Sequence, residues 1–267
     1  MSEYIKICED ALRAGGEVLL SWQGRIRAKE KGPRDLVTEA DVASQEAIRK
    51  VLIGAFPCHD FLGEEDCNDS ANPPGTTGLG ASASGYRWIV DPLDGTTNYV
   101  HQFQNFAVSV ALEHEGQIVV GGVYDPVLDH CYLAEAGKGA KLNGNFLNVS
   151  SCHQLEQSLM AVSFSANVKR DSREVLRFIE VLQCCQALRR LGSCALNLCY
   201  LAAGQLDGYF ATSVKTWDVA AGMLIVNESG GIVTNIDGGP FDLWNPEFAA
   251  AATNSLQKQL ISVLKRV

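Results

Sequence analysis

The chain of 267 residues lacks several features that would assign it to a special class of protein. No apolar run approaches the roughly 20 residues that a membrane-spanning helix needs, so we expect no association with a membrane. The first residues contain no basic segment followed by an apolar one, the pattern of a signal peptide, and we therefore expect a cytoplasmic protein. We find neither an internal repeat nor a low-complexity tail, and the composition is that of an ordinary globular chain.

Positive charge is also scarce, because 22 Lys and Arg residues stand against 31 Asp and Glu residues, for a formal net charge of −9. This balance argues against nucleic-acid binding, which needs clustered basic residues. It does not exclude anionic substrates, since bound metal ions can supply positive charge locally. The nine cysteines include no CxxC pair, and no histidine flanks them at the spacing of a zinc site. We expect reduced thiols that serve as small, partly buried residues.

The chain alternates helical and extended segments, which predicts an α/β fold built from layers. Helices are expected at 3–24, 38–55, 170–186, 193–204, 217–229 and 255–266. Strands are expected at 59–62, 86–90, 106–113, 117–124, 130–134, 159–164, 187–191, 206–212, 232–234 and 248–252. A boundary near 145–155 divides the chain into halves at 1–147 and 148–267. The segment 66–85 is rich in Gly, Ser, Asn and Pro and is expected to be a mobile surface loop.

The most informative segment is Asp91–Asn98, with the sequence DPLDGTTN. It follows an aromatic and apolar run at 86–90 that predicts a buried strand. Pro92 biases Asp91 toward an extended conformation and should end the strand ladder. Gly95 allows close backbone approach, and the residues after it can start a helix whose N–H groups accept a phosphate. Taken by itself, this segment is as typical of an Asp-rich turn as of a binding site.

Other acidic residues stand at predicted strand ends and helix starts, far apart in the sequence: Asp41, Glu64, Glu65 and Asp218. Each has an ordinary explanation as a helix-terminal acid, a solvated turn or an N-cap, and Thr38 with Asp41 predicts a capping box. If these acids converge with Asp91 and Asp94, their repulsion raises their pKa values. Magnesium, which takes hard oxygen ligands, would relieve that repulsion. Two such ions can activate a water and stabilise the departing oxygen of an in-line displacement.

Together these motifs resemble the inositol monophosphatase family, in content and in order, over nearly the whole chain. The motifs are Asp35–Thr38 before Asp41, Gly63–Glu65, Asp91–Asn98, Trp217–Gly222, Glu228–Gly231 and Gly239–Phe241. The resemblance implies an αβαβα five-layer sandwich of the inositol monophosphatase and fructose-bisphosphatase type, which is commonly a homodimer. It also implies a magnesium-dependent, lithium-sensitive hydrolase of phosphate monoesters that forms no phosphoenzyme.

The same resemblance implies roles for individual residues, with two to three Mg²⁺ ions per site and Mn²⁺ as a substitute. The implied metal ligands are Glu64, Asp91, the Leu93 carbonyl, Asp94 and Asp218. The implied catalytic residues, of which Asp41 and Thr96 would orient the attacking water, are Asp41, Glu64 and Thr96. The implied substrate contacts are Asp94, Gly95, Thr96, Ser193, Cys194, Ala211 and Asp218. Every metal-ligand position is intact, which argues against an inactive homologue.

The chain departs from the family pattern at Ala211, where members that act on inositol phosphate usually carry a glutamate for the sugar hydroxyls. Cys194 stands where a smaller residue is common. Lys215 is either a surface lysine or an attractor for a second anionic group.

The expected substrate is a small phosphorylated metabolite, with inositol 1-monophosphate as the family default. Histidinol phosphate, fructose 1,6-bisphosphate and a 3′-phosphonucleotide are alternatives within the same chemistry. A regulatory protein-binding homologue is the alternative of another class, because some members of the family engage RNA or the transcription machinery.

Overall fold

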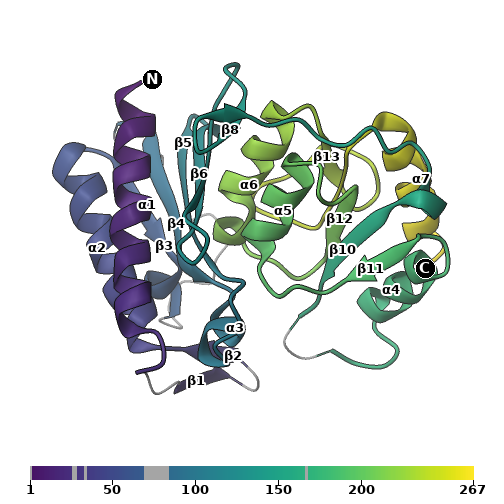
Figure 1. The fold of residues 1–267 in the computed structure, drawn as a ribbon, viewed down its shortest axis with the longest axis horizontal. Helices are drawn as coiled ribbons and strands as arrows, with labels where there is room; N and C mark the ends of the chain where they lie inside the picture. Colours follow the sequence, from purple (N-terminus) through teal and green to yellow (C-terminus); the bar gives the residue numbers. More distant parts are fainter. Residues whose placement is uncertain (1, 26–28, 33–34, 69–83, 166–167) are drawn as a thin grey trace.

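A computed structural model describes residues 2–25, 29–32, 35–68, 84–165 and 168–267. Helices and sheets alternate in five layers, which is the αβαβα sandwich expected from the sequence (Figure 1). One outer layer consists of the helices α1 (Glu3–Trp22) and α2 (Glu39–Ala55). The middle layer consists of α5 (Cys194–Ala202) and α6 (Thr216–Glu228), and the other outer layer consists of α4 (Arg173–Leu182) and α7 (Asn254–Leu264). None of the described helices is both long and apolar enough to cross a membrane.

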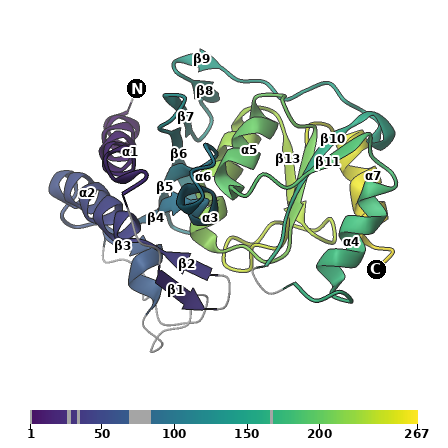
Figure 2. The same ribbon diagram turned by 60° about the horizontal axis from the view of Figure 1, so that its bottom comes forward.

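The larger sheet has seven strands in the order β3-β4-β5-β6-β7-β8-β9. These strands are β3 (Asp60–Gly63), β4 (Tyr86–Asp94), β5 (Ala107–His114), β6 (Gln117–Asp125), β7 (His130–Glu135), β8 (Ala140–Leu142) and β9 (Asn145–Phe146). Only β3 and β4 are parallel, and every other neighbouring pair is antiparallel. A separate hairpin of β1 (Lys29–Gly32) and β2 (Asp35–Val37) lies beside the short helix α3 (Thr96–Val100) (Figure 2).

The smaller sheet has five strands in the order β11-β10-β12-β14-β13. They are β10 (Leu159–Ser163), β11 (Ala187–Arg189), β12 (Gly208–Ala211), β13 (Ile232–Asn235) and β14 (Phe248–Ala251). Because β11, β10 and β12 run parallel to one another, their carboxyl ends share one edge of the sheet. The predicted boundary between 147 and 148 falls in the connection from β9 to β10 and stays a prediction.

Three apolar clusters fill the spaces between the layers. The first joins α1 and α2 to the larger sheet through residues such as Leu12, Ile48 and Trp88. The second surrounds α5 and α6 between the two sheets, and the third joins α4 and α7 to the smaller sheet. Two helices begin at a capping side chain: Ser193 accepts a hydrogen bond from an N–H in the first turn of α5, and Thr253 does the same for α7.

Helix α6 approaches its neighbours closely because glycines stand at two contact points. A Cβ atom on Gly121 of β6 would lie 2.8 Å from the carbonyl oxygen of Ala221 in α6. A Cβ atom on Gly222 would lie 2.5 Å from the side chain of Leu198 in α5. Helix α6 therefore packs at backbone contact distance against β6 of the larger sheet and closely against α5 within the middle layer.

The strand ending at residue 90 was predicted too short. Strand β4 continues through Asp94, and its pairing with β5 is irregular: Asp91 lies opposite Ser109, whereas Asp94 lies opposite Ala107. Pro92 stands inside this bulge, at a position where the strand pairing requires no N–H donor, so the lack of an N–H group in proline costs no hydrogen bond. The motif is therefore held by the sheet instead of leaving it.

Other predicted elements differ mainly at their ends. The helix expected at 170–186 is α4, 173–182, because the chain turns and the N–H of Gln186 donates to the Ser158 carbonyl beside β10. The strands β1 and β2 were not among the strands expected from the sequence. Most of the loop expected at 66–85 lies outside the described residues, and its first residues belong to a short 3-10 helix, η1 (Glu64–Asn68).

We expect Gly121→Ala to lower the free energy of unfolding by about 1–3 kcal/mol, because the new methyl group would press on the backbone of α6. The matched control is Gly54→Ala in α2, where nothing lies within 4 Å of the added Cβ atom. That change should be neutral or stabilising by up to about 1 kcal/mol, since alanine favours helix over glycine. Urea unfolding followed by tryptophan fluorescence measures both. Equal effects at the two positions would contradict the close contact between β6 and α6.

Candidate active site

The predicted acids come from four separate elements and meet beside the bulge of β4. Asp41 lies in the first turn of α2, Glu64 directly follows β3, and Asp218 lies in the first turn of α6. The charges of Glu64, Asp94 and Asp218 each raise the pKa of Asp91, in addition to the larger effect of its burial. Residues separated by more than 100 positions therefore share one electrostatic environment.

Asp41 has two different neighbours for its two carboxylate oxygens. One oxygen accepts hydrogen bonds from the backbone N–H and the hydroxyl of Thr38, at 2.8 and 2.6 Å, so the predicted capping box is confirmed. The other oxygen accepts a hydrogen bond from the Thr96 hydroxyl at 3.4 Å. Asp41 is buried, and it therefore connects the start of α2 to the motif after β4 instead of serving only as a cap.

Local hydrogen bonds hold the bulge of β4. The Leu93 N–H donates to Asp91 at 3.0 Å, and the Ser44 hydroxyl donates to the Pro92 carbonyl at 3.0 Å. The Thr96 hydroxyl also lies 3.1 Å from the Leu93 carbonyl oxygen, to which it can donate. These contacts fix the direction of the Asp91 carboxylate and of the Leu93 carbonyl.

Gly95 makes the turn from β4 into α3 with a φ of 93°, a left-handed conformation that favours glycine. A Cβ atom there would lie 3.0 Å from the Asn105 carbonyl oxygen and 3.4 Å from that of Gly192. Asn98 then ties the turn to the C-terminal half, because its amide donates to the carbonyls of Asn105 and Leu191 at 2.7 and 2.8 Å. The tight turn is thus locked against the segment that precedes α5.

Asp94 is buried at the N-terminus of α5 and accepts three hydrogen bonds there. The N–H groups of Cys194 and Ala195 donate to it at 3.1 and 2.7 Å, and the Ser193 hydroxyl donates as well. Burial raises the pKa of Asp94 to about 6, and the three hydrogen bonds act in the opposite direction. The end of β4 and the start of α5 are therefore joined through this one carboxylate.

Glu64 and Asp218 are only half-buried. The residue before Glu64 is Gly63, and a side chain on it would collide with Gln45, whose amide oxygen accepts the Glu65 N–H at 3.0 Å. Asp218 accepts the backbone N–H of Lys215 at 2.7 Å. Burial, followed by the charges of Glu64 and Asp94, raises the pKa of Asp218, while that hydrogen bond and the Lys215 charge oppose the rise.

A cavity of about 810 Å³ opens beside these acids, between the turn after β4 and the edge of the smaller sheet. Five of the predicted substrate contacts line it: Asp94, Gly95, Thr96, Cys194 and Asp218. Ser193 lies behind Asp94 and positions it. Ala211 is fully buried at the end of β12, opposite Phe248, and is not among the lining residues, so its methyl group offers no direct contact to a bound molecule.

Thr97 and Asn98 of the predicted motif also line the cavity, as does Gly192 beside the predicted contacts Ser193 and Cys194. The lining residues that were not identified from the sequence are Phe103, Ser163, Phe164, Ser165, Val168, Arg190, Leu191, Ser213 and Val214. Most of these residues follow the carboxyl ends of β10, β11 and β12. The parallel pairing of those strands could have indicated these residues, because it places the strand ends at one edge of the sheet. Single residues after strands, however, form no motif that a sequence shows.

The donor set fits magnesium by its chemistry. Asp91, Asp94 and Asp218 are hard oxygen donors, and burial raises the pKa values of all three, with the charges of neighbouring acids adding to the rise for Asp91 and Asp218. Within the described ranges, no three acidic, histidine or cysteine side chains are close enough together to enclose one ion. The aspartates instead turn oxygens toward backbone N–H groups, as the hydrogen bonds above show.

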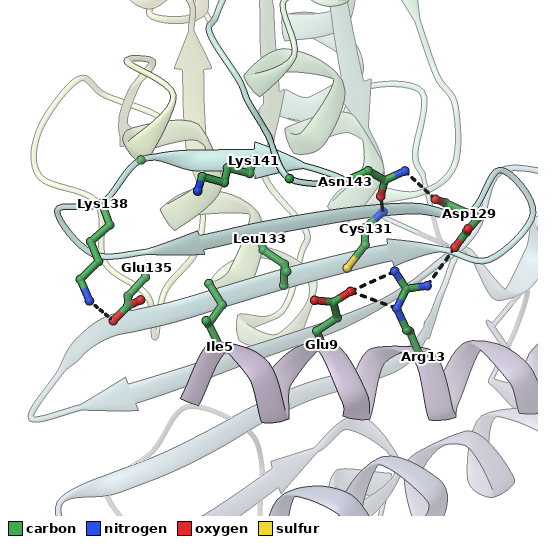
Figure 3. Close-up of a pocket in the computed structure, with 12 residues that line it drawn as sticks. Ile5, Glu9, Arg13, Asp129, Cys131, Leu133, Glu135, Lys138, Lys141 and Asn143 are labelled. Carbon is green, nitrogen blue, oxygen red and sulfur yellow. Dashed lines mark hydrogen bonds and ion pairs between the residues drawn. The ribbon is translucent and has the colours of Figure 1, made fainter. Parts of the chain in front are cut away.

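Two further features serve the fold. Glu228, in the motif near the end of α6, accepts the N–H groups of Gly137 and Gly139 at 2.8 and 2.7 Å and fastens the turn between β7 and β8. A second cavity, of about 610 Å³, lies between α1 and β7 (Figure 3). Several of its charges are paired within its own wall, where Arg13 contacts Glu9 and Asp129, each at 2.9 Å.

Comparison with known proteins shows which family the chain resembles in sequence and in structure. A sequence model of the inositol monophosphatase family matches residues 1–267. Nus factor SuhB of Pasteurella multocida is 36% identical over 264 residues, which are 97% of this chain and 95% of that protein. Inositol monophosphatase 2 of Solanum lycopersicum is 40% identical over 256 residues, 94% of each chain. The crystal structure of extragenic suppressor protein suhB from Bartonella henselae superposes with a TM-score of 0.89 at 34% identity and 99% coverage of both chains.

We expect the protein in EDTA to lose stability as the pH rises from about 4 toward neutrality. Protonated Asp91 stabilises the fold, and this contribution is complete below the ordinary pKa of 3.8 and is lost as the pH rises through its raised folded-state pKa. Asp91→Asn removes this titrating group and should therefore flatten the decline by at most about 1.4 kcal/mol per pH unit. The variant should keep the local structure, because its amide oxygen can still accept the Leu93 N–H.

Urea unfolding in EDTA between pH 5 and pH 8 measures this slope. The control is Asp10→Asn, which removes an exposed carboxylate of α1 and should keep the wild-type slope. An unchanged slope in Asp91→Asn would show that Asp91 is not under electrostatic strain.

Proposed function

The chain belongs to the inositol monophosphatase family, and from this premise we propose that it hydrolyses a small phosphate monoester by direct attack of water, with Mg²⁺ as cofactor and no phosphoenzyme. Its enzyme class is phosphoric monoester hydrolase. The observation that carries the proposal is that Asp94 and Asp218 line one cavity while the pKa values of Asp91 and Asp218 are raised by burial and, to a smaller extent, by the charges of neighbouring acids. Groups perturbed in this way, in a cleft, are typical of active sites.

Magnesium would be held by the carboxylates of Glu64, Asp91, Asp94 and Asp218 and by the main-chain carbonyl of Leu93. When bound, it supplies positive charge that lowers the pKa of a water and neutralises the oxygens of the phosphate. The proposed number is two to three ions, with Mn²⁺ as a substitute. The same premise supports a lithium-sensitive, homodimeric, cytoplasmic enzyme.

The protein's own groups orient the water and the phosphate. Asp41 is fixed on one side by Thr38, so its second oxygen is held toward the Thr96 hydroxyl at 3.4 Å. This pair is proposed to orient the attacking water, with Glu64 as the third catalytic residue. Gly95 and Thr96 border the cavity, and their N–H groups are the proposed donors to the phosphate. Because α5 fixes Asp94, the far side of the phosphate site is rigid as well.

The substrate is proposed to be of the inositol 1-monophosphate type, because one similar protein is named inositol-1-monophosphatase. The buried methyl group of Ala211 supplies no acceptor for a polyol hydroxyl, which supports histidinol phosphate, fructose 1,6-bisphosphate or a 3′-phosphonucleotide as alternatives. A regulatory protein-binding role is a second candidate, because similar proteins are named Nus factor. The presence of every acid that the proposed hydrolysis requires favours the enzyme.

We expect Asp218→Asn to reduce magnesium-dependent phosphate release from inositol 1-phosphate by about 10³-fold, because several kcal/mol of transition-state stabilisation depend on the bound ions. In EDTA the variant should be at least as stable as the wild type, since one repelling charge is gone. Saturating Mg²⁺ should stabilise the wild type, by about 2.7 kcal/mol at 100 times the dissociation constant, and the variant much less.

Phosphate release and thermal unfolding with and without Mg²⁺ test this. Asp10→Asn, which removes an exposed carboxylate of α1, is again the matched control and should behave as the wild type. Near-normal turnover of Asp218→Asn at saturating Mg²⁺ would refute the assignment of this ligand.

A further inference from the structure

The cavity beside the acids has two chemically different walls. One wall carries Asp94 and Asp218, together with the turn at Gly95. The other wall comes from the smaller sheet, where Phe164 follows β10 and Arg190 follows β11. A substrate whose phosphate lies against the first wall presents the rest of its structure to the second, so the second wall selects the substrate.

The hydroxyl groups of the second wall are already engaged within the protein. Ser163 shares a hydrogen bond of 2.7 Å with the Tyr209 hydroxyl. Ser165 donates to Glu174 at 2.7 Å, and Ser213 donates to the same carboxylate at 3.4 Å. Glu174 also accepts the Ser165 N–H at 3.0 Å. Because this nearby carboxylate is engaged by three donors, it is a poor acceptor for the hydroxyls of a neutral polyol.

Arg190 differs from these groups because its charge is not neutralised. Its guanidinium carbon lies 5.5 Å from the centre of the Phe164 ring, and in the described part of the chain it forms no ion pair. The side chain is exposed and lines the cavity. An aromatic ring orients a guanidinium without consuming its hydrogen-bond donors, so the planar fork stays available for a ligand.

We infer that Arg190, oriented by Phe164, is a specificity-determining residue that binds a second anionic group of the substrate. The favoured substrates are then phosphate monoesters that carry another phosphate or a carboxylate. This inference rests on the proposed function, and it names the substrate class for the same site. A guanidinium recognises either group through paired hydrogen bonds. In a chain of net charge −9, an anionic group away from the bound cations needs such a partner.

The test compares matched substrates that differ by one anionic group. The pairs are glucose 1-phosphate with glucose 1,6-bisphosphate, and glycerol 3-phosphate with 3-phosphoglycerate. In Arg190→Gln we expect the ratio of kcat/KM, doubly anionic over singly anionic, to fall about 10- to 100-fold, mainly through KM, because hydrogen bonds to charged groups are lost. Arg190→Lys should restore part of the ratio, since it returns the charge but not the fork.

The matched control is Arg189→Gln, because Arg189 is the adjacent arginine, donates to the Leu188 carbonyl at 3.3 Å and does not line the cavity. Its ratio should equal that of the wild type. An unchanged ratio in Arg190→Gln, or an equal fall in Arg189→Gln, would overturn the inference.

A binding measurement separates this inference from the proposed hydrolysis. Calorimetric titration with non-hydrolysable phosphonate analogues of glycerol 3-phosphate and 3-phosphoglycerate, in Mg²⁺, gives the affinity ratio without turnover. We expect that ratio to depend on Arg190 in the same way. If the wild type released no phosphate from any substrate, the proposed hydrolysis would fail, yet an Arg190-dependent affinity ratio would still support the anion site. A ratio near one in the wild type and in Arg190→Gln would reject the site even in an active enzyme.

Discussion

The structure depends on carboxylates that the fold holds close together against their own repulsion. Asp91 and Asp94 are buried in one short bulge, and the charges of Glu64 and Asp218 act on the same place. Burial of like charges opposes folding unless another interaction offsets it. Three N–H or hydroxyl donors from the start of α5 partly offset it for Asp94, whereas for Asp91 the described residues supply the Leu93 N–H. The remaining imbalance is what a bound cation would relieve.

Such an arrangement requires rigid support, and the middle layer provides it. Helix α6 is packed against β6 at backbone contact distance because residue 121 is a glycine, so Asp218 is held at a fixed height above β4. Asn98 binds the turn after β4 to the segment before α5. The two sheets are therefore connected at the site itself as well as through the apolar core. If this connection were loose, the acids could move apart and their repulsion would fall. The proposed site would then lose its affinity for cations.

Much of this architecture could be predicted from the sequence, and the exceptions have physical reasons. The spacing of apolar residues in α1 and the Thr38–Asp41 box predicted both outer helices, because these signals are local. The bulge of β4 could not be predicted, since the pairing of Asp91 with Ser109 and of Asp94 with Ala107 is set by another strand. The engagement of Asp94 by α5 was missed for the same reason: the partners lie about 100 residues away. Ala211 was expected to border the substrate because it occupies the position of a glutamate in the family that the chain resembles, and the packing shows that its methyl group is buried.

The proposed metal ligands and the inferred anion site depend on different sheets, so the reaction and the substrate selectivity could vary independently in such a fold. The acids depend on the larger sheet and on the buried start of α6, where most substitutions would disturb packing on two sides. Arg190 and Phe164 stand after strands of the smaller sheet, where a side chain can change without altering β4 or the α5 contact to Asp94. If Arg190 binds a second anionic group as we infer, substitutions at that position would change what the cavity accepts, while the groups proposed to hold the cations would stay as they are. Selectivity would then depend on the charge of the second wall, where a cation favours an anionic tail over a neutral polyol.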